Sequence, residues 1–263
     1  MQHRRIVSIG LVCLGLGFGL GAATAQAQAP AAAAAPKFGV LSFLGESINI
    51  IGSRPSTGSR LSKNDQMSVD IPDAGFDASA LSATQATLKR LAPQNEAMLF
   101  NVKAPKWIAN PNELFTDGKL QVSAKLLESL RASGATHLVV LTRHRAEALV
   151  QFHDWGYNMG GTAEGLGYII SRMERVIDKT TGNTQDGFIA PFVFVRLSLV
   201  NLSDASVIKQ RTITVAQPLT MKISSASTDP WDSLPAAEKI DKLNQMIERE
   251  LDNALPKLVE GLI

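Results

Sequence analysis

Cysteine is almost absent from this 263-residue chain, and the one that occurs, Cys13, lies within the first 27 residues. Once those residues are removed, the chain can form no disulfide, no thiolate nucleophile and no cysteine-ligated metal site. A charge excess is absent as well. Removing the first 27 residues takes away Arg4 and Arg5, which lowers Lys plus Arg from 26 to 24 against 24 Asp plus Glu. This neutral balance argues against nucleic acid as a partner.

The first 27 residues have the layout of a secretory signal peptide. Arg4 and Arg5 form a basic start, residues 6–21 are apolar and uncharged, and small residues allow cleavage after Ala25 or Ala27. The apolar stretch is shorter than the roughly 20 residues that a membrane span needs. The sequence therefore predicts a protein that is periplasmic or secreted, with no membrane span after cleavage.

Residues 28–36 are rich in alanine and proline and predict a disordered linker, and residues 37–263 predict a single domain. Apolar runs between turn-rich segments predict strands, and apolar residues at helical spacing predict helices. The strands are predicted at 37–44, 47–51, 66–71, 97–102, 136–141, 166–177, 188–202 and 207–215. The helices are predicted at 77–91, between the cap Thr116 and Gly134, and at 234–263.

These elements predict an α/β (α+β) domain with a mixed sheet. The first two strands suit a hairpin that turns at Gly45 and Glu46. The order of strand, helix and strand over residues 97–141 implies a parallel helix crossover. The last three strands are separated by short turns and predict an antiparallel meander. The C-terminal helix has Pro235 in its first turn and is expected to pack on the sheet, with a kink or a break at Pro256.

Two weak patterns suggest a hydrolase. Residues 43–48 (FLGESI) resemble the nucleophile block of the GDSL esterases, which would make Ser47 the nucleophile. That family takes its base from an Asp-x-x-His, which this chain lacks. His144, His153 and Asp154 are an alternative catalytic or metal-binding group, but their spacing matches no ligand motif. We therefore predict no metal and no cofactor, and we keep the hydrolase as an alternative function.

The glycine-rich stretch 155–167 (WGYNMGGTAEGLG) is the least usual part of the sequence. Its plainest interpretation is a flexible excursion between two strands, because it does not stand between a strand and a helix as phosphate-binding loops do. The alternative is a partner-binding loop whose anchors are Trp155, Tyr157 and Asn158, since aromatic residues dominate interface energetics. A small-ligand carrier with a pocket under this loop is a further alternative.

Three features together resemble a group of envelope α/β domains. They are the early strand, the junction at 134–141 (GATHLVVL) and the long hairpin from 192 to 213. The group includes the N-terminal domain of TolB, the curli secretion lipoprotein and the lipoprotein activators of penicillin-binding proteins. The turn Ser203–Ser206 departs from the Asp-x-x-Thr-Gly that is common there. The resemblance is one of layout, and it implies a non-catalytic interaction domain whose partner is another envelope protein or a glycan.

Overall fold

The computed structural model describes residues 35–52, 64–95, 97–102, 105–152, 156–177, 184–219 and 229–263. All of them belong to one unit, Ala35–Ile263. The predicted signal segment 1–27 and most of the predicted linker fall outside these ranges and remain predictions. Among the helices that are described, none is both long enough and apolar enough to cross a bilayer.

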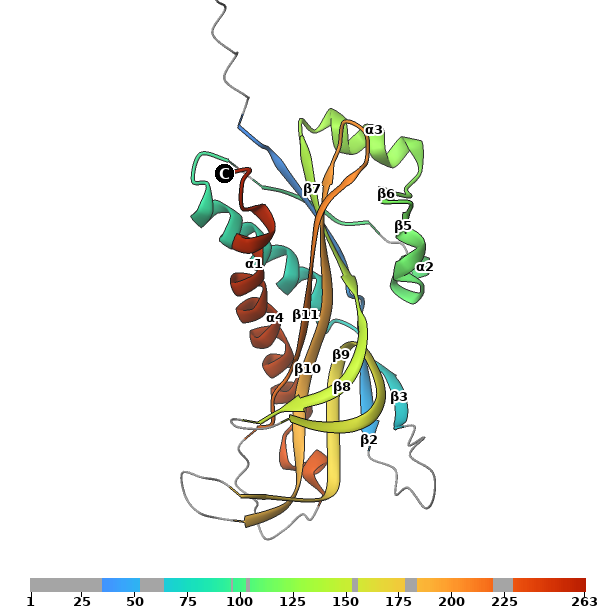
Figure 1. The fold of residues 1–263 in the computed structure, drawn as a ribbon, viewed down its shortest axis with the longest axis vertical. Coiled ribbons are helices and arrows are strands. Elements are labelled where there is room, and N and C mark those ends of the chain that lie inside the picture. Colours follow the sequence, from blue (N-terminus) through green and yellow to red (C-terminus); the bar gives the residue numbers. More distant parts are fainter. Residues whose placement is uncertain are drawn as a thin grey trace, which may run out of the picture. The chain divides into compact units, whose positions relative to one another are not determined.

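A curled mixed sheet forms the centre of this unit, as the sequence predicts (Figure 1). Its main path runs in the order β3-β2-β9-β10-β7-β1-β4, while β11 pairs with β10 and β8 pairs with β9. The strands are β1 (Phe38–Phe43), β2 (Ser47–Gly52), β3 (Asp65–Asp70), β4 (Met98–Phe100), β7 (His137–Arg143), β8 (Arg145–Gln151), β9 (Gly156–Ile177), β10 (Thr184–Asn201) and β11 (Val207–Ala216). A separate small pair is made by β5 (Phe115–Thr116) and β6 (Lys119–Leu120).

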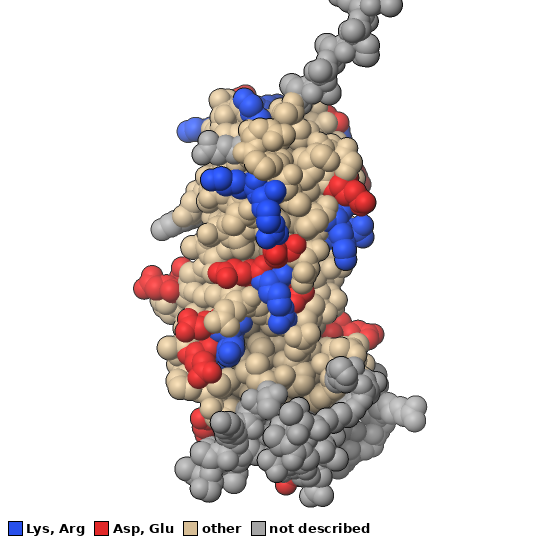
Figure 2. Space-filling view, turned by 90° about the vertical axis from the view of Figure 1, so that its left-hand side faces the viewer, with Lys and Arg blue, Asp and Glu red and all other residues tan. Residues whose placement is uncertain are grey.

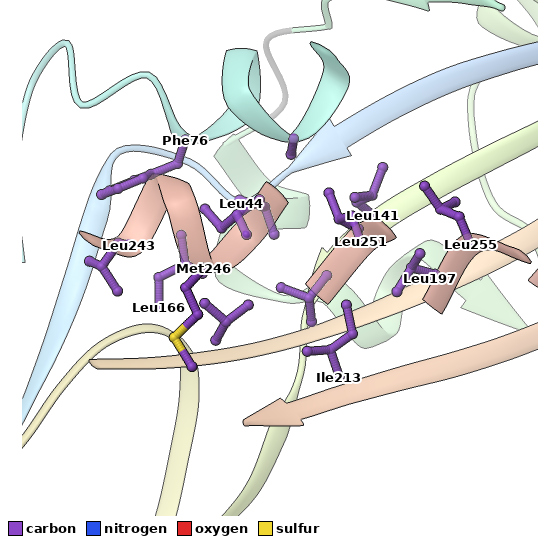
Figure 3. Close-up of a cluster of buried hydrophobic side chains, with 14 of the residues drawn as sticks. Leu44, Phe76, Leu141, Leu166, Leu197, Ile213, Leu243, Met246, Leu251 and Leu255 are labelled. Carbon is purple, nitrogen blue, oxygen red and sulfur yellow. The ribbon is translucent and has the colours of Figure 1, made fainter. Parts of the chain in front are cut away.

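Helices cover both faces of the sheet (Figure 1). The long helices α1 (Phe76–Leu91) and α4 (Ala236–Val259) lie on one face. On the other lie α2 (Pro105–Ala109), the 3-10 turn η1 (Pro111–Leu114) and α3 (Ala124–Ala132), and a second 3-10 turn, η2 (Pro230–Ser233), precedes α4. The apolar stripe of α4 is buried against the sheet, as predicted: Leu243, Leu251 and Leu255 point toward sheet residues such as Leu197 (Figure 3).

The predicted chain path is confirmed in two places. β1 pairs in parallel with β7 on one edge and with β4 on the other. β4 and β7, the strands of the predicted helix crossover, are therefore parallel, with β1 between them. β9, β10 and β11 form the predicted antiparallel meander.

The predicted hairpin between β1 and β2 is wrong. All six residues of β1 are buried, so β1 is a central strand that needs apolar neighbours on both edges. It finds them in β4 and β7, whereas β2 pairs with β3 and runs parallel to β9. The connection turns at Gly45, whose φ of +68° favours glycine.

Three predicted helix boundaries also differ. Asp77 is not the N-cap of α1, because Gly75 is in that position and the Asp77 carboxylate accepts a hydrogen bond from the Leu44 N–H instead. Thr116 belongs to the small β5–β6 pair, and α3 is capped instead by Ser123, whose hydroxyl accepts from the Leu126 N–H. The last helix runs through Pro256 without a break.

Candidate functional site

The connection between β1 and β2 ends at Ser47, the candidate nucleophile and the first residue of β2. Asp77 of α1 fastens it from one side, since its carboxylate accepts hydrogen bonds from the Ser42 hydroxyl (2.5 Å), the Leu44 N–H (2.8 Å) and the Gly45 N–H (3.1 Å). Backbone groups at a sharp turn that leaves a central strand would otherwise lack partners. Asp77 is therefore a structural acceptor for this turn.

Arg143, at the end of β7, fastens the same connection from the other side. Its Nε donates to the Leu44 carbonyl (2.6 Å), and its Nη2 donates to the Ser47 carbonyl (2.9 Å) and the Ser47 hydroxyl (2.8 Å). Burial lowers the pKa of Arg143, and nearby acids, with Glu164 the strongest, oppose that effect. A guanidinium donates hydrogen bonds and accepts none. The described partner of the Ser47 hydroxyl thus cannot take its proton.

His144 lies beyond β7, and its described ring contact is with Arg196 of β10. The Arg196 Nη2 is 3.1 Å from the His144 Nδ1, and its Nη1 donates to Asn112 of η1 at 3.2 Å. Since arginine only donates, this Nδ1 is the acceptor nitrogen of a neutral imidazole. His153 and Asp154 lie outside the described residues. Within the described ranges, no group of three or more His, Cys, Asp or Glu side chains could hold a metal ion.

Acidification should weaken the fold in part through His144. Burial lowers the pKa of this imidazole, and the Arg196 cation lowers it further. The unfolded chain, with a histidine pKa near 6.5, therefore binds more protons than the folded protein as the pH falls below about 6.5, and the free energy of unfolding falls with it. Urea unfolding at two pH values, about 7.5 and 5.5, should show a smaller loss in His144→Gln than in the wild type. An equal loss in both proteins would contradict this expectation.

The described part of the glycine-rich stretch, residues 156–167, is not a loop. Residues 156–164 form the first part of β9, and they pair antiparallel with β8 from Gln151↔Gly156 to Arg145↔Glu164. Positive φ angles at Gly160, Gly161 and Gly165 bend the strand where other residues would be strained. Gly165 also leaves room for the Arg143 side chain, since a Cβ there would lie 2.9 Å from the Arg143 Cδ. The glycines thus shape a curled strand.

Of the three predicted partner-binding residues, two are described. Tyr157 is half-buried and packs edge-on against Phe188 of β10, with ring centroids 5.8 Å apart. Phe152 packs against the same ring at 5.4 Å, so Phe152 and Tyr157 are both anchored to β10. Asn158 is exposed, and its side-chain oxygen accepts from the Gly160 N–H at 2.8 Å. Trp155 lies outside the described residues.

A groove of about 340 Å³ lies beside this hairpin, between β8 and β11. It is lined by Ala146, Glu147, Leu149, Gln151, Thr214, Val215, Ala216 and Gln217. Leu149 is 41% exposed in it, whereas Ala148 and Val150 on either side are buried. We call this recess the β8–β11 groove. No prediction from the sequence covers this groove, although the alternation of residues 145–151 is typical of a half-buried strand.

A second groove, of about 460 Å³, lies on the outer side of the two long helices. Small residues of α1 line it, such as Ala83 and Ala86, together with Arg90, Arg249 and Asp252. Arg90 and Asp252 form an exposed ion pair there. Figure 2 shows basic and acidic side chains interspersed over this side of the molecule. Exposed pairs of this kind contribute little to stability.

No family model matches the chain, and no curated protein matches its sequence. Among solved structures, the chain is similar to the PelC dodecamer from Paraburkholderia phytofirmans, at 16% identity over 85% of this chain and 91% of that chain, with a TM-score of 0.30. It is also similar to a neuraminyllactose-binding hemagglutinin homolog from Helicobacter pylori (9% identity, 83% and 82% covered, TM-score 0.41). A lipoprotein from Neisseria meningitidis is a third (8% identity, 83% and 99% covered, TM-score 0.27). These neighbours include envelope-type proteins, but likeness at this level is distant and transfers no function to this chain.

Proposed function

We propose that the protein is an exported envelope protein that binds another envelope component at the β8–β11 groove and carries out no reaction. The observation that carries this proposal is a recess lined by apolar and polar side chains in equal number, with a large apolar side chain, Leu149, 41% exposed in it. A recess that combines an exposed apolar side chain with polar groups is typical of binding sites. The first 27 residues of the protein resemble a signal peptide, which supports a location in the periplasm or outside the cell.

Rigidity of the groove supports the same proposal. The Phe188 ring packs edge-on against both Phe152 and Tyr157, which ties the chain next to Gln151 to β10. A fixed surface loses less conformational entropy on binding. The candidate catalytic groups support binding over catalysis, since Ser47 and His144 each contact an arginine in the described structure.

A photo-crosslinking side chain at Gln151, which lines the groove, tests the proposal in intact cells. We expect a discrete crosslinked product from the envelope fraction, and we expect Leu149→Ser to reduce it at least about tenfold because an apolar anchor is lost. The matched control is Ile208→Ser on β11, which changes an equally apolar side chain that is 45% exposed. Equal losses in both variants, or no product at Gln151, would count against the groove as the binding surface.

A further inference from the structure

β3 is an edge strand of the described sheet. β2 is the one described strand that pairs with it, over six residues from Ser47↔Asp70 to Gly52↔Asp65. Figure 1 shows it at the border of the sheet, beside β2. Five of its six residues are exposed and the sixth, Val69, is half-buried. An edge strand of this length presents backbone groups that can pair with another strand.

The pairing pattern identifies which backbone groups face outward. The Ile71 N–H donates to the Glu46 carbonyl, so these two residues form a hydrogen-bonded pair. Such pairs alternate along an antiparallel ladder. Met67 and Val69 therefore point their N–H and C=O groups at β2. Residues 66, 68 and 70 point theirs away, which leaves a row of three donors and three acceptors on the outer edge.

An apolar rim accompanies this edge. Met67 is 57% exposed, and its neighbour on the same strand face, Val69, packs against the main core together with Ile50 of β2. An added antiparallel strand would place two of its residues directly opposite Met67 and Val69. Both would be non-hydrogen-bonded pairs, in which the side chains of the two strands contact most closely. Apolar side chains at those two places would extend the core.

One end of the edge is acidic. Asp70, Asp73 and Glu46 are all exposed there, and none of them has an ion-pair partner among the described residues. The backbone N–H and C=O of Asp70 belong to the outward row, and its side chain is on the same face of β3 as those of Gln66 and Ser68. A basic side chain directly opposite Asp70 would complement this charge.

We propose that β3 accepts an extended peptide segment as an added antiparallel strand. The segment has the pattern basic, apolar, polar, apolar, polar, with the basic residue opposite Asp70 and the apolar residues opposite Val69 and Met67. Backbone hydrogen bonds to residues 66, 68 and 70 provide affinity, and the alternating side chains provide selectivity. This surface is separate from the β8–β11 groove, and the inference does not depend on the proposed function.

The probe is the capped peptide acetyl-Arg-Val-Thr-Val-Thr-amide, titrated into the protein and followed by amide NMR. We expect shifts at the amides of residues 66, 68 and 70. Replacing the peptide's arginine with glutamate should weaken binding roughly fivefold, since one exposed attraction becomes a repulsion. N-methylation of the middle threonine should abolish binding because that N–H faces β3, whereas N-methylation of the second valine should change little.

The matched protein variants are Ser68→Pro and Ser68→Ala. Proline removes only an outward N–H, a place where edge strands tolerate it, so β2 pairing and the fold should persist while the peptide no longer binds. Alanine should bind as the wild type does. Binding that survives Ser68→Pro, equal binding of the reversed sequence, or no binding at millimolar peptide would each overturn the proposal. A dimer that Ser68→Pro dissociates would also overturn it, in favour of a second copy as the occupant.

Discussion

Gly167→Ala should prevent the protein from folding, or should cost more than about 4 kcal/mol of unfolding free energy. A Cβ at this position would lie 1.8 Å from the Asn49 carbonyl oxygen and 2.7 Å from its carbon. Both atoms are backbone, so no side chain can rotate away, and β2 and β9 would have to separate where they pair in parallel. If β2 separated from β9, the core residues on both faces of β2 would be exposed to water.

Urea unfolding followed by circular dichroism measures this effect, and Gly52→Ala is the control. Gly52 also lies in the β2–β9 ladder, yet a Cβ there would meet no atom within 4 Å. We expect a change of no more than about 1 kcal/mol in that variant. If Gly167→Ala were as mild as Gly52→Ala, the close approach of the two strands would be wrong.

Arg143→Met should give the second-largest effect, a loss of about 3 kcal/mol. Methionine keeps much of the apolar stem but leaves the Leu44 and Ser47 carbonyls without their donors. Unpaired buried acceptors cost roughly 1–3 kcal/mol each. Arg143→Lys should recover only part of the loss, because an ammonium cannot reproduce the fork that joins three acceptors.

Arg145→Met is the matched control for this prediction. Arg145 is two residues further along the chain, is exposed, and bonds to the Thr162 hydroxyl at the surface. Its loss should change the unfolding free energy by about 0.5 kcal/mol or less. Comparable losses in both variants would show that Arg143 does not fasten the β1–β2 connection.

The sequence predicts most elements of this fold because their signals are local. The buried stripe of α4 repeats at helical spacing, and β7 is a short apolar run after Gly134, whose φ of +87° suits the end of α3. The partners of β1 and β2 could not be predicted in this way. A turn-like Gly45 is compatible with a hairpin or with a crossover, and only contacts between distant segments decide between them.

The candidate site was harder to predict for the same reason. Glycine content alone favours a loop for residues 155–167, but Gly165 and Gly167 are there because the Arg143 side chain and the β2 backbone approach closely. Likewise, Ser47 in a Gly-Glu-Ser sequence resembles a nucleophile. The structure shows that its hydroxyl accepts a hydrogen bond from Arg143, which is nearly one hundred residues later in the chain. Tertiary neighbours, which the local sequence does not contain, decide the role of each residue.

The parallel pairing of β2 with β9 also has a consequence for the order of folding. β2 pairs with β3 and β1 with β4, so one edge of each strand finds its partner early. The other edge pairs much later in the chain, since Phe38 of β1 pairs with His137 and Asn49 of β2 pairs with Gly167. A chain that emerges from its N-terminus first holds these two edges unpaired until β7 and β9 follow. Such long-range contacts slow folding and expose segments that aggregate. This protein should therefore depend on a chaperone, or on slow synthesis, more than a helical protein of equal length would.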